Sequence, residues 1–252
     1  MAQTGNARTT MSLDELVTQL QHAHGSSLVG IVLYGSKATA DKASGGADHN
    51  VLVIVETLSM ETLRSLGQTA RAWQEAGNPP PLFLTREEWL SSADVFPMEY
   101  ADILERHRVL AGTLPLEGIV VDATHLRLQV EQEALGKLLR LRRAVMLAGT
   151  DVPRQRALMR ESLSAMLVIL RSVLRLHGER PAADPIDVIT RAATLCAFDE
   201  GPFLRIQRSK EQTERSGEIS DADVEQVLVG YVRDAQALVA YLDRFVPPSR
   251  GG

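Results

Sequence analysis

A glycine followed by a serine, Gly35 and Ser36, ends an apolar segment in the first part of the chain. Glycine lets the backbone approach a phosphate group closely, and the hydroxyl and amide groups that follow can donate hydrogen bonds to phosphate oxygens. The next apolar segment opens with two side chains that carry oxygen ligands, Asp48 and Asn50. Because Mg²⁺ binds such oxygens, these residue types predict a site for a phosphorylated compound and a divalent cation.

Two lysines lie in the small, polar and glycine-rich segment between those pairs. Their ammonium groups would neutralise phosphate charge beside the glycine turn. We therefore add Lys37 and Lys42 to Gly35 and Ser36 as candidate phosphate-binding residues.

Both flanking segments have the composition of buried β-strands. Residues 28–34 and 50–55 are rich in β-branched and apolar side chains and are bounded by glycine or polar residues. Side chains alternate along a strand, so Asp48 and Asn50 are expected on one face, where both oxygens reach one ligand. The turn and the start of the second strand are thus predicted to form one site.

The rest of the first half shows helix and strand patterns in turn. Prolines before the third apolar segment predict that it forms an edge strand. The expected elements are a helix from Ser12 to Gly25, a helix from Ser59 to Ala76, a strand at 82–85, an extended stretch at 95–100 and a helix around 103–110.

The second half has no strand pattern, and its apolar residues recur at helical spacing. A helix from Pro153 to His177 is apolar on nearly all sides between Leu163 and Leu176, as the central helix of a bundle must be. Residues 207–218 are interpreted as a solvated loop or linker. We expect a flexible leader at 1–11, an α/β (α+β) domain with a small mixed sheet at 12–118, an all-α helical bundle at 119–246 and a tail at 247–252.

The arrangement of the Gly35-Ser36 turn and Asp48-His49-Asn50 resembles the signature of the nucleotidyltransferase superfamily that includes DNA polymerase β. In that family a Gly-Ser or Gly-Gly turn precedes two acidic residues separated by one apolar residue. The resemblance covers residues 28–110, and the helices beyond resemble the bundles of kanamycin-type nucleotidyltransferases. It implies a protein that binds a nucleoside triphosphate with Mg²⁺ and transfers a nucleoside monophosphate to a hydroxyl of a small-molecule or protein acceptor.

The resemblance also assigns roles to residues. Asp48 and Asn50 would hold the metal, and the turn with its lysines would hold the phosphates. The family has an acidic residue where this chain has Asn50, and its third carboxylate has no counterpart at 82–85, so Glu99 is the candidate replacement and the candidate base. Loss of one negative charge lowers the expected affinity for Mg²⁺. A catalytically degenerate nucleotide-binding or protein-interaction module, with the bundle forming a homodimer or contacting a partner, is therefore kept as an alternative.

A minor alternative comes from the helix that ends at His177. Arg171 and His177 match the loose arginine-to-histidine motif of HEPN ribonucleases. Six residues on a regular helix leave the two side chains roughly 120° apart around the axis, so one undistorted helix does not aim them together.

Composition limits the kinds of binding partner and the cellular compartment that we expect for this protein. The net charge is −5 and the pI about 5.7, so binding to nucleic acid is not expected. No apolar stretch approaches the roughly 20 residues of a membrane helix. With a single cysteine and no signal-peptide pattern at the start, the sequence is expected to be that of a cytoplasmic protein. The resemblance to nucleotidyltransferases implies that the protein is bacterial.

Overall fold

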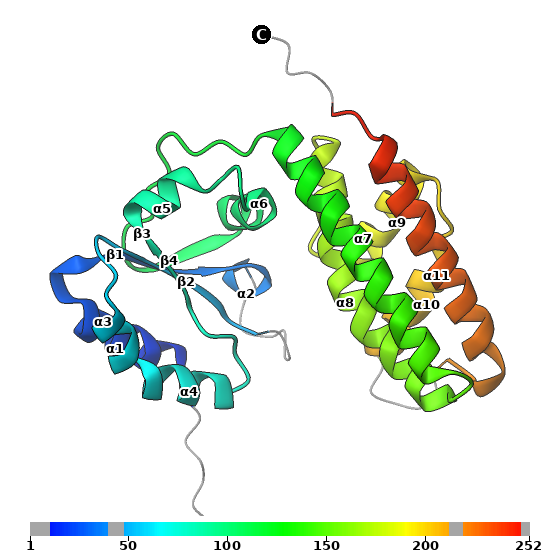
Figure 1. Ribbon diagram of the computed structural model, residues 1–252, viewed down its shortest axis with the longest axis horizontal. Coiled ribbons are helices and arrows are strands. Elements are labelled where there is room, and N and C mark those ends of the chain that lie inside the picture. The colour runs from blue at the N-terminus through cyan, green and yellow to red at the C-terminus, as the bar shows by residue number, and fades with distance from the viewer. Residues whose placement is uncertain (1–10, 40–47, 212–218, 248–252) are drawn as a thin grey trace, which may run out of the picture. The chain divides into compact units, whose positions relative to one another are not determined.

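The computed structural model describes residues 11–39, 48–211 and 219–247 (Figure 1). Most of the expected leader and tail, Lys42 and the side chain of Ser36 lie outside the described part. The chain divides into two compact units, Met1–Val121 and Asp122–Gly252. Each unit has its own core, and we describe them one after the other.

The described residues of the first unit form a mixed sheet with the strand order β3-β2-β1-β4. Strand β1 pairs antiparallel with both β2 and β4, whereas β2 pairs in parallel with β3. The expected edge position of the third strand is confirmed, and the first two strands have the expected bounds. The strands are β1 (Leu28–Tyr34), β2 (Asn50–Val55), β3 (Leu82–Thr85) and β4 (His107–Gly112).

Strand β4 corrects the expectation of a helix around 103–110. Helix α6 (Pro97–Glu105) begins early, with Pro97 in its first turn, and ends before Arg106. The chain then pairs with β1, and Tyr34 lies opposite His107. Pairing with a buried strand satisfies the backbone of this charged segment and overrides its local helix preference. The expected extended stretch at 95–100 is wrong for the same segment, because Glu99 lies in the first turn of α6.

The other helices of this unit follow their capping signals. Helix α1 (Leu13–His24) has the complete capping box at Ser12, as expected. The single helix expected between Ser59 and Ala76 is two helices, which meet at Leu66. The remaining helical segments are η1 (Gly25–Ser27), α2 (Ser36–Thr39), α3 (Met60–Ser65), α4 (Gly67–Glu75) and α5 (Arg86–Ser91).

The sheet buries a different set of side chains on each face. One set packs with α1 and α4 and includes Leu16, Ile31 and Trp73. The other packs with α5 and α6 and includes Trp89 and Tyr100, whose rings stack with centroids 4.4 Å apart. Both tryptophans therefore lie between helix and sheet, and α6 is fixed against the face that carries the side chains at positions 32, 52 and 54.

The second unit is a helical bundle. Helix α8 packs against all four other helices of the unit, which confirms its central position. Helix α10 corrects the first part of the expected loop at 207–218, because it continues to Glu211 with Gln207 and Ser209 buried. Residues 212–218 of that expected loop lie outside the described residues. Its apolar residues Phe203 and Ile206 anchor one face in the core. The helices are α7 (Ala123–Ala148), α8 (Val152–Leu176), α9 (Pro185–Cys196), α10 (Gly201–Glu211) and α11 (Asp221–Arg244).

A small mixed sheet with helices, followed by a helical bundle, confirms the expected fold class. Among the described residues, no helix is long and apolar enough to cross a membrane.

The end of β4 approaches β1 so closely that a side chain at Gly30 would overlap the carbonyl of Thr113. We therefore expect Gly30→Ala to lower the free energy of unfolding by about 1–3 kcal/mol, as overpacking does elsewhere. Gly67→Ala is the matched control, because a side chain there meets only the flexible end of Arg71. Urea unfolding of both variants measures the difference, and equal stability would contradict the close approach.

Candidate functional site

The turn at Gly35 joins the end of β1 to the end of α6. Gly35 is buried and has φ +80°, a backbone conformation that glycine adopts without strain. Its amide donates a hydrogen bond of 3.0 Å to the carbonyl of Arg106, and its carbonyl accepts one of 3.1 Å from the amide of Ala38. The turn therefore has a fixed geometry and connects β1, α2 and the α6–β4 junction.

Two polar side chains converge on this turn from β2 and α6. A Cβ atom added to Gly35 would lie 3.5 Å from Asn50 Nδ2 and 3.5 Å from Asp102 Oδ2. Asn50 Nδ2 and Asp102 Oδ2 are therefore at most about 7 Å apart, twice the 3.5 Å that separates each of them from that Cβ position. Asn50 lies opposite Tyr34 in the sheet, and alternation places both on the face that packs against α5 and α6.

Tyr34 is the third member of this group. Burial raises the pKa of its hydroxyl, and the negative charges of Glu99 and Asp102 raise it further. The phenol therefore lies within electrostatic reach of both α6 carboxylates and stays protonated at neutral pH. A neutral hydroxyl in this position can donate a hydrogen bond to a ligand oxygen.

Asp102 and Arg106 form an ion pair one helical turn apart. The two side chains are 25% and 15% exposed, so the pair is only partly screened by water. Arg106 Nε is buried and has no hydrogen-bond partner within the described residues. The pair places a largely neutralised carboxylate beside Gly35.

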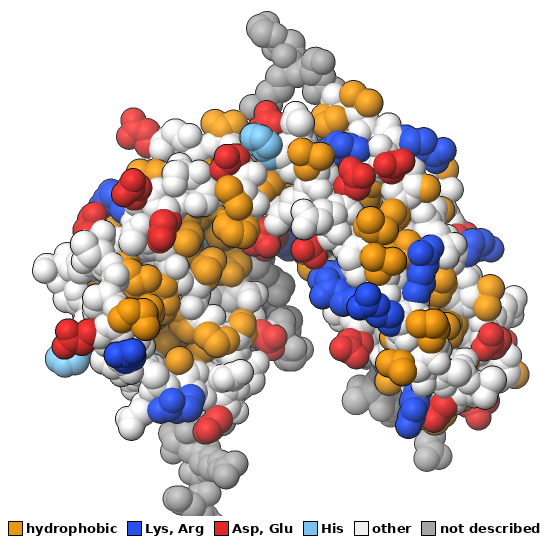
Figure 2. All heavy atoms as spheres, viewed as in Figure 1, with side chains coloured by type: hydrophobic (Ala, Val, Ile, Leu, Met, Phe, Trp, Pro, Cys, Tyr) orange, Lys and Arg blue, Asp and Glu red, His pale blue; other side chains and the backbone are white. Residues whose placement is uncertain are grey.

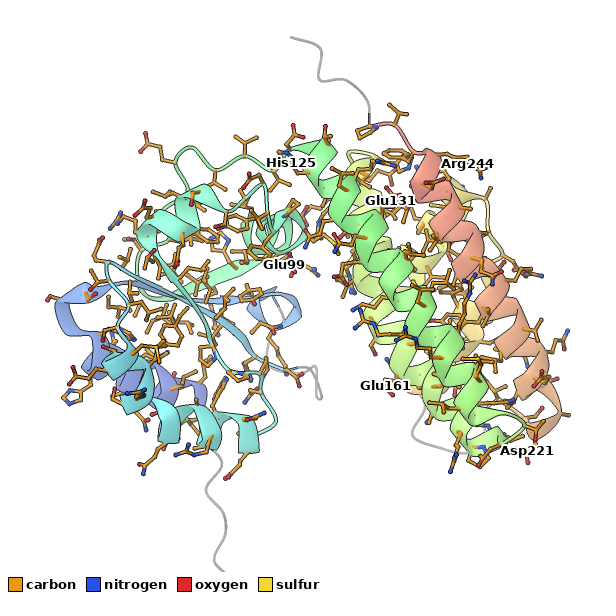
Figure 3. The ribbon with its side chains drawn as sticks, viewed as in Figure 1. Glu99, His125, Glu131, Glu161, Asp221 and Arg244 are labelled. Atoms are coloured by element: carbon orange, nitrogen blue, oxygen red, sulfur yellow. The ribbon has the colours of Figure 1, made fainter. Side chains whose placement is uncertain are left out.

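Glu99, the expected third carboxylate, is exposed on the first turn of α6 (Figure 3). Asp102 lies three residues later, so helical spacing puts it on the same face. The structure shows Asp102, and not Glu99, beside Gly35. The sequence did not indicate Asp102, because residues 95–100 were expected to be extended; on a helix, the spacing of the two carboxylates would have indicated it.

Asp48 and His49 stand before β2 and differ in their contacts. His49 belongs to the opposite face, where its amide and Nδ1 lie 3.0 and 3.2 Å from Asn78 Oδ1 and its ring centroid lies 5.9 Å from that of Trp73. Asp48 is exposed, and alternation favours the Asn50 face for it. Lys37 is half-buried in α2. The structure thus brings Asn50 to the turn and leaves the roles of Asp48 and Lys37 as predictions.

The described donors do not form the metal centre that the resemblance implies. Within the residues that the structure describes, no group of three or more His, Cys, Asp or Glu side chains is placed to hold a metal ion. Asn50 is uncharged, and the carboxylate of Asp102 is paired with Arg106. Asn50 and the paired Asp102 by themselves would leave a dication without the negative charge that normally compensates it. The metal roles of Asp48 and Asn50 therefore stay predictions.

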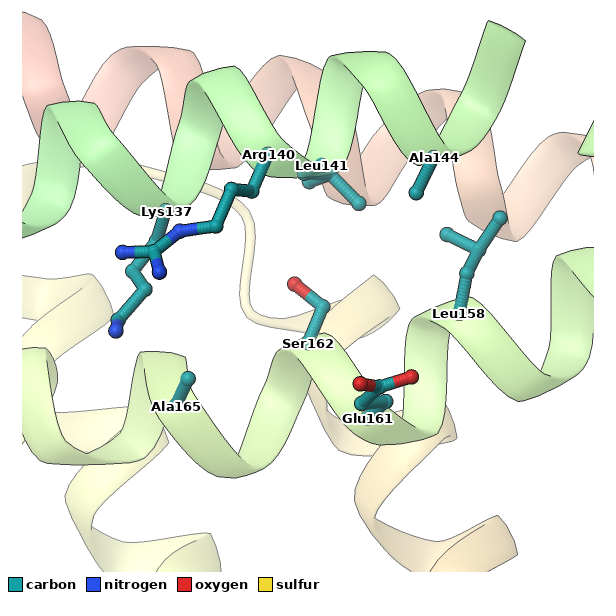
Figure 4. Close-up of a pocket in the computed structure, with 8 residues that line it drawn as sticks. All are labelled: Lys137, Arg140, Leu141, Ala144, Leu158, Glu161, Ser162 and Ala165. Atoms are coloured by element: carbon teal, nitrogen blue, oxygen red, sulfur yellow. The ribbon is translucent and has the colours of Figure 1, made fainter. Parts of the chain in front are cut away.

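The second unit holds a cavity of about 260 Å³ between α7 and α8 (Figure 4). Lys137 and Arg140 of α7 and Glu161 and Ser162 of α8 line it, together with small and branched apolar side chains. Ser162 Oγ also lies 3.0 Å from the hydroxyl of Tyr231. Sequence patterns did not indicate this cavity, because its residues come from two helices.

His177, the residue of the minor nuclease alternative, joins α8 to α11. Its Nε2 lies 2.8 Å from the hydroxyl of Tyr241, and its ring centroid lies 4.9 Å from that of Phe245. Burial lowers the pKa of His177. These contacts describe a structural role, and the nuclease alternative stays a prediction.

No protein-family model and no curated protein matches this chain. Among solved structures, the chain is similar to the spectinomycin adenyltransferase AAD(9) from Enterococcus faecialis, whose crystal structure was determined with ATP and spectinomycin. The TM-score is 0.58 at 12% sequence identity, over 92% of this chain and 98% of that one. At this identity the similarity shows the fold alone, and it confirms the expected nucleotidyltransferase-like fold.

The surroundings of Tyr34 can be tested by titration. Because negative charges on α6 raise the pKa of the Tyr34 hydroxyl, we expect Glu99→Gln and Asp102→Asn each to lower it toward 10.0. Burial remains in both variants, so the pKa should stay above that value. Tyrosinate absorbance against pH, with Tyr34→Phe subtracted, gives the measurement. Glu87→Gln on α5 is the control, and unchanged titration in all three would show that α6 does not act on Tyr34.

Proposed function

We propose that this chain binds a nucleoside triphosphate at the Gly35 turn and does not transfer its nucleotidyl group efficiently. The observation that carries the proposal is the turn itself, in a nucleotidyltransferase-like fold, with Asn50 and Asp102 converging on it. The similar protein was solved with ATP, which supports a nucleotide as the ligand.

The turn and its neighbours have complementary roles in binding. Ser36 and Lys37 contact the β- and γ-phosphates, and Lys42 adds positive charge from the adjoining segment. Tyr34 donates its proton in a hydrogen bond, and Arg106 balances the carboxylate of Asp102 so that it does not repel the phosphates. Asp48 faces any Mg²⁺ that arrives with the triphosphate. This Mg²⁺ is part of the ligand, because it enters the site bound to the nucleotide.

The same residues limit transfer. In-line displacement at the α-phosphorus depends on charge neutralisation and on alignment of the attacking hydroxyl. This site has an amide at Asn50, and its Asp102 carboxylate is occupied by Arg106. Both features leave binding intact and weaken the stabilisation of the transition state, which favours a catalytically degenerate nucleotide-binding protein.

Thermal unfolding with each nucleoside triphosphate, with and without Mg²⁺, tests the binding site. Ligand at a hundredfold excess over its Kd stabilises the native state by about 2.7 kcal/mol, so Tm should rise. We expect the rise to disappear in Lys37→Ala and to shrink in Asp48→Ala when Mg²⁺ is present. Glu75→Ala on α4 is the control for loss of a surface charge. A Tm that no nucleotide changes at millimolar concentration would refute the proposed site.

Transfer to an acceptor hydroxyl is the second candidate function. The observation in its favour is that the similarity covers both units and extends to a protein solved with ATP and an acceptor, spectinomycin. The acceptor of this chain would then be a hydroxyl-bearing small molecule or a protein side chain. Mg²⁺ supplied with the nucleotide would serve as part of the substrate.

Labelled ATP and a panel of hydroxyl-bearing acceptors, beginning with spectinomycin, separate the two candidates. For a degenerate site we expect no labelled product from the parent or from Asn50→Asp, because the Asp102 carboxylate stays paired with Arg106 in both. Transfer by the parent would establish the second candidate. Transfer by Asn50→Asp alone would show that one missing charge is the whole defect.

A further inference from the structure

Helix α7 exposes five large apolar side chains. Leu128, Leu135, Leu139 and Met146 are 51%, 44%, 44% and 76% exposed, and Leu147 is 79% exposed. The buried residues of the same helix are Leu126, Val130, Ala134, Leu138, Leu141 and Ala148. Hydrophobic side chains lie among charged ones on the surface of this unit (Figure 2).

Leu128, Leu135, Leu139 and Met146 form one line along the helix, which we name the α7 seam, whereas Leu147 lies to one side of it. At about 100° per residue the four seam residues fall within about 40° of one another around the helix axis. Most of the buried residues of α7 lie on the opposite side of the axis. The seam is therefore a second apolar face, which the bundle of this chain does not cover.

The spacing along the α7 seam is symmetric. Its members follow one another at intervals of seven, four and seven residues. The pattern is therefore symmetric about Lys137, with the same spacing toward each end of the helix. A twofold rotation perpendicular to the helix therefore superimposes the seam on an antiparallel second copy. Leu128 then meets Met146 of the second copy, and Leu135 meets Leu139 of the second copy. Such spacing, close to a heptad repeat, suits side-by-side helix packing.

The charges that flank the α7 seam have the same symmetry. Glu131 and Arg142 lie on the same edge of the seam, at nearly equal distances from the level of Lys137 in opposite directions. Within its own chain, Glu131 also forms an ion pair of 2.8 Å with Arg127. In the antiparallel arrangement, each edge of the seam lies against the same edge of the second copy. Glu131 therefore comes beside Arg142 of the second copy, and the twofold rotation forms this pair twice. A parallel arrangement would bring opposite edges together and place Arg142 beside Arg143 of the second copy, which is repulsive.

We propose that the α7 seam binds a second copy of this chain, with the two α7 helices antiparallel about a twofold axis at the level of Lys137. The proposal rests on the apolar spacing and on the charge complementarity of one helix, and it is independent of the nucleotide site. The central position of α8 explains why α7 has a free outer face, because α7 packs on α8 and α11 with its other side.

Sedimentation equilibrium of the full chain measures the association. We expect a dimer, and we expect Leu135→Glu with Leu139→Glu to raise its Kd by at least tenfold, because four negative charges then meet at the axis. Val229→Glu on α11 replaces another exposed apolar residue, 59% exposed, and should leave the dimer intact. A parent chain that is monomeric at about 100 µM, or a dimer that the double variant does not weaken, would overturn the proposal.

Disulfide cross-linking tests the direction of the helices. Residues 128 and 146 are about 27 Å apart along α7 at 1.5 Å per residue. An oxidised mixture of Leu128→Cys and Met146→Cys proteins should therefore form cross-linked dimers, whereas each variant alone should not. Burial raises the pKa of the native Cys196 thiol to about 12, which keeps it unreactive. Cross-linking of each variant alone would show parallel packing and overturn the antiparallel arrangement.

Discussion

The pairing of β1 with β2 on one side and β4 on the other is the constraint on which the candidate site depends. It brings three separate parts of the chain to the end of β1, where Gly35 donates a hydrogen bond to the carbonyl of Arg106. That bond fixes the end of α6 and therefore places Asp102 beside the turn. The packing of Trp89 and Tyr100 holds α6 against the same face of the sheet. A site of this kind needs long-range contacts, because Gly35, Asn50 and Asp102 are far apart in the chain.

Charge pairing determines the electrostatics beside the Gly35 turn. The ion pair between Asp102 and Arg106 neutralises the carboxylate that lies beside Gly35, and Asn50 contributes no charge. A phosphate group approaching the turn therefore meets less repulsion from Asp102 than it would from an unpaired carboxylate. The carboxylates of Glu99 and Asp102 still raise the pKa of Tyr34. We connect the uncharged Asn50 and the paired Asp102 with the proposed loss of transfer in a fold that this chain shares with an adenyltransferase.

The helical bundle has an organisation of its own. Its central helix, α8, packs against the four other helices and is largely buried. Each outer helix therefore packs one face against the core of the bundle and exposes another face. In α7 the free face carries apolar residues in a symmetric pattern, flanked by opposite charges. Polar and apolar side chains from α7 and α8 also line an open pocket within the unit. These features come from helix packing and need no contribution from the sheet.

The sequence by itself determined the local elements of this protein: both central strands, the edge strand after the prolines, the capped helix α1 and the apolar α8 follow from composition, periodicity and capping. It also indicated the glycine turn and Asn50. Only the tertiary structure decided that residues 107–112 pair as a strand, that Glu99 belongs to a helix and that Asp102 is the carboxylate beside Gly35. The reason is physical: helix preference and alternation act over a few residues, whereas strand pairing depends on a partner distant in the chain.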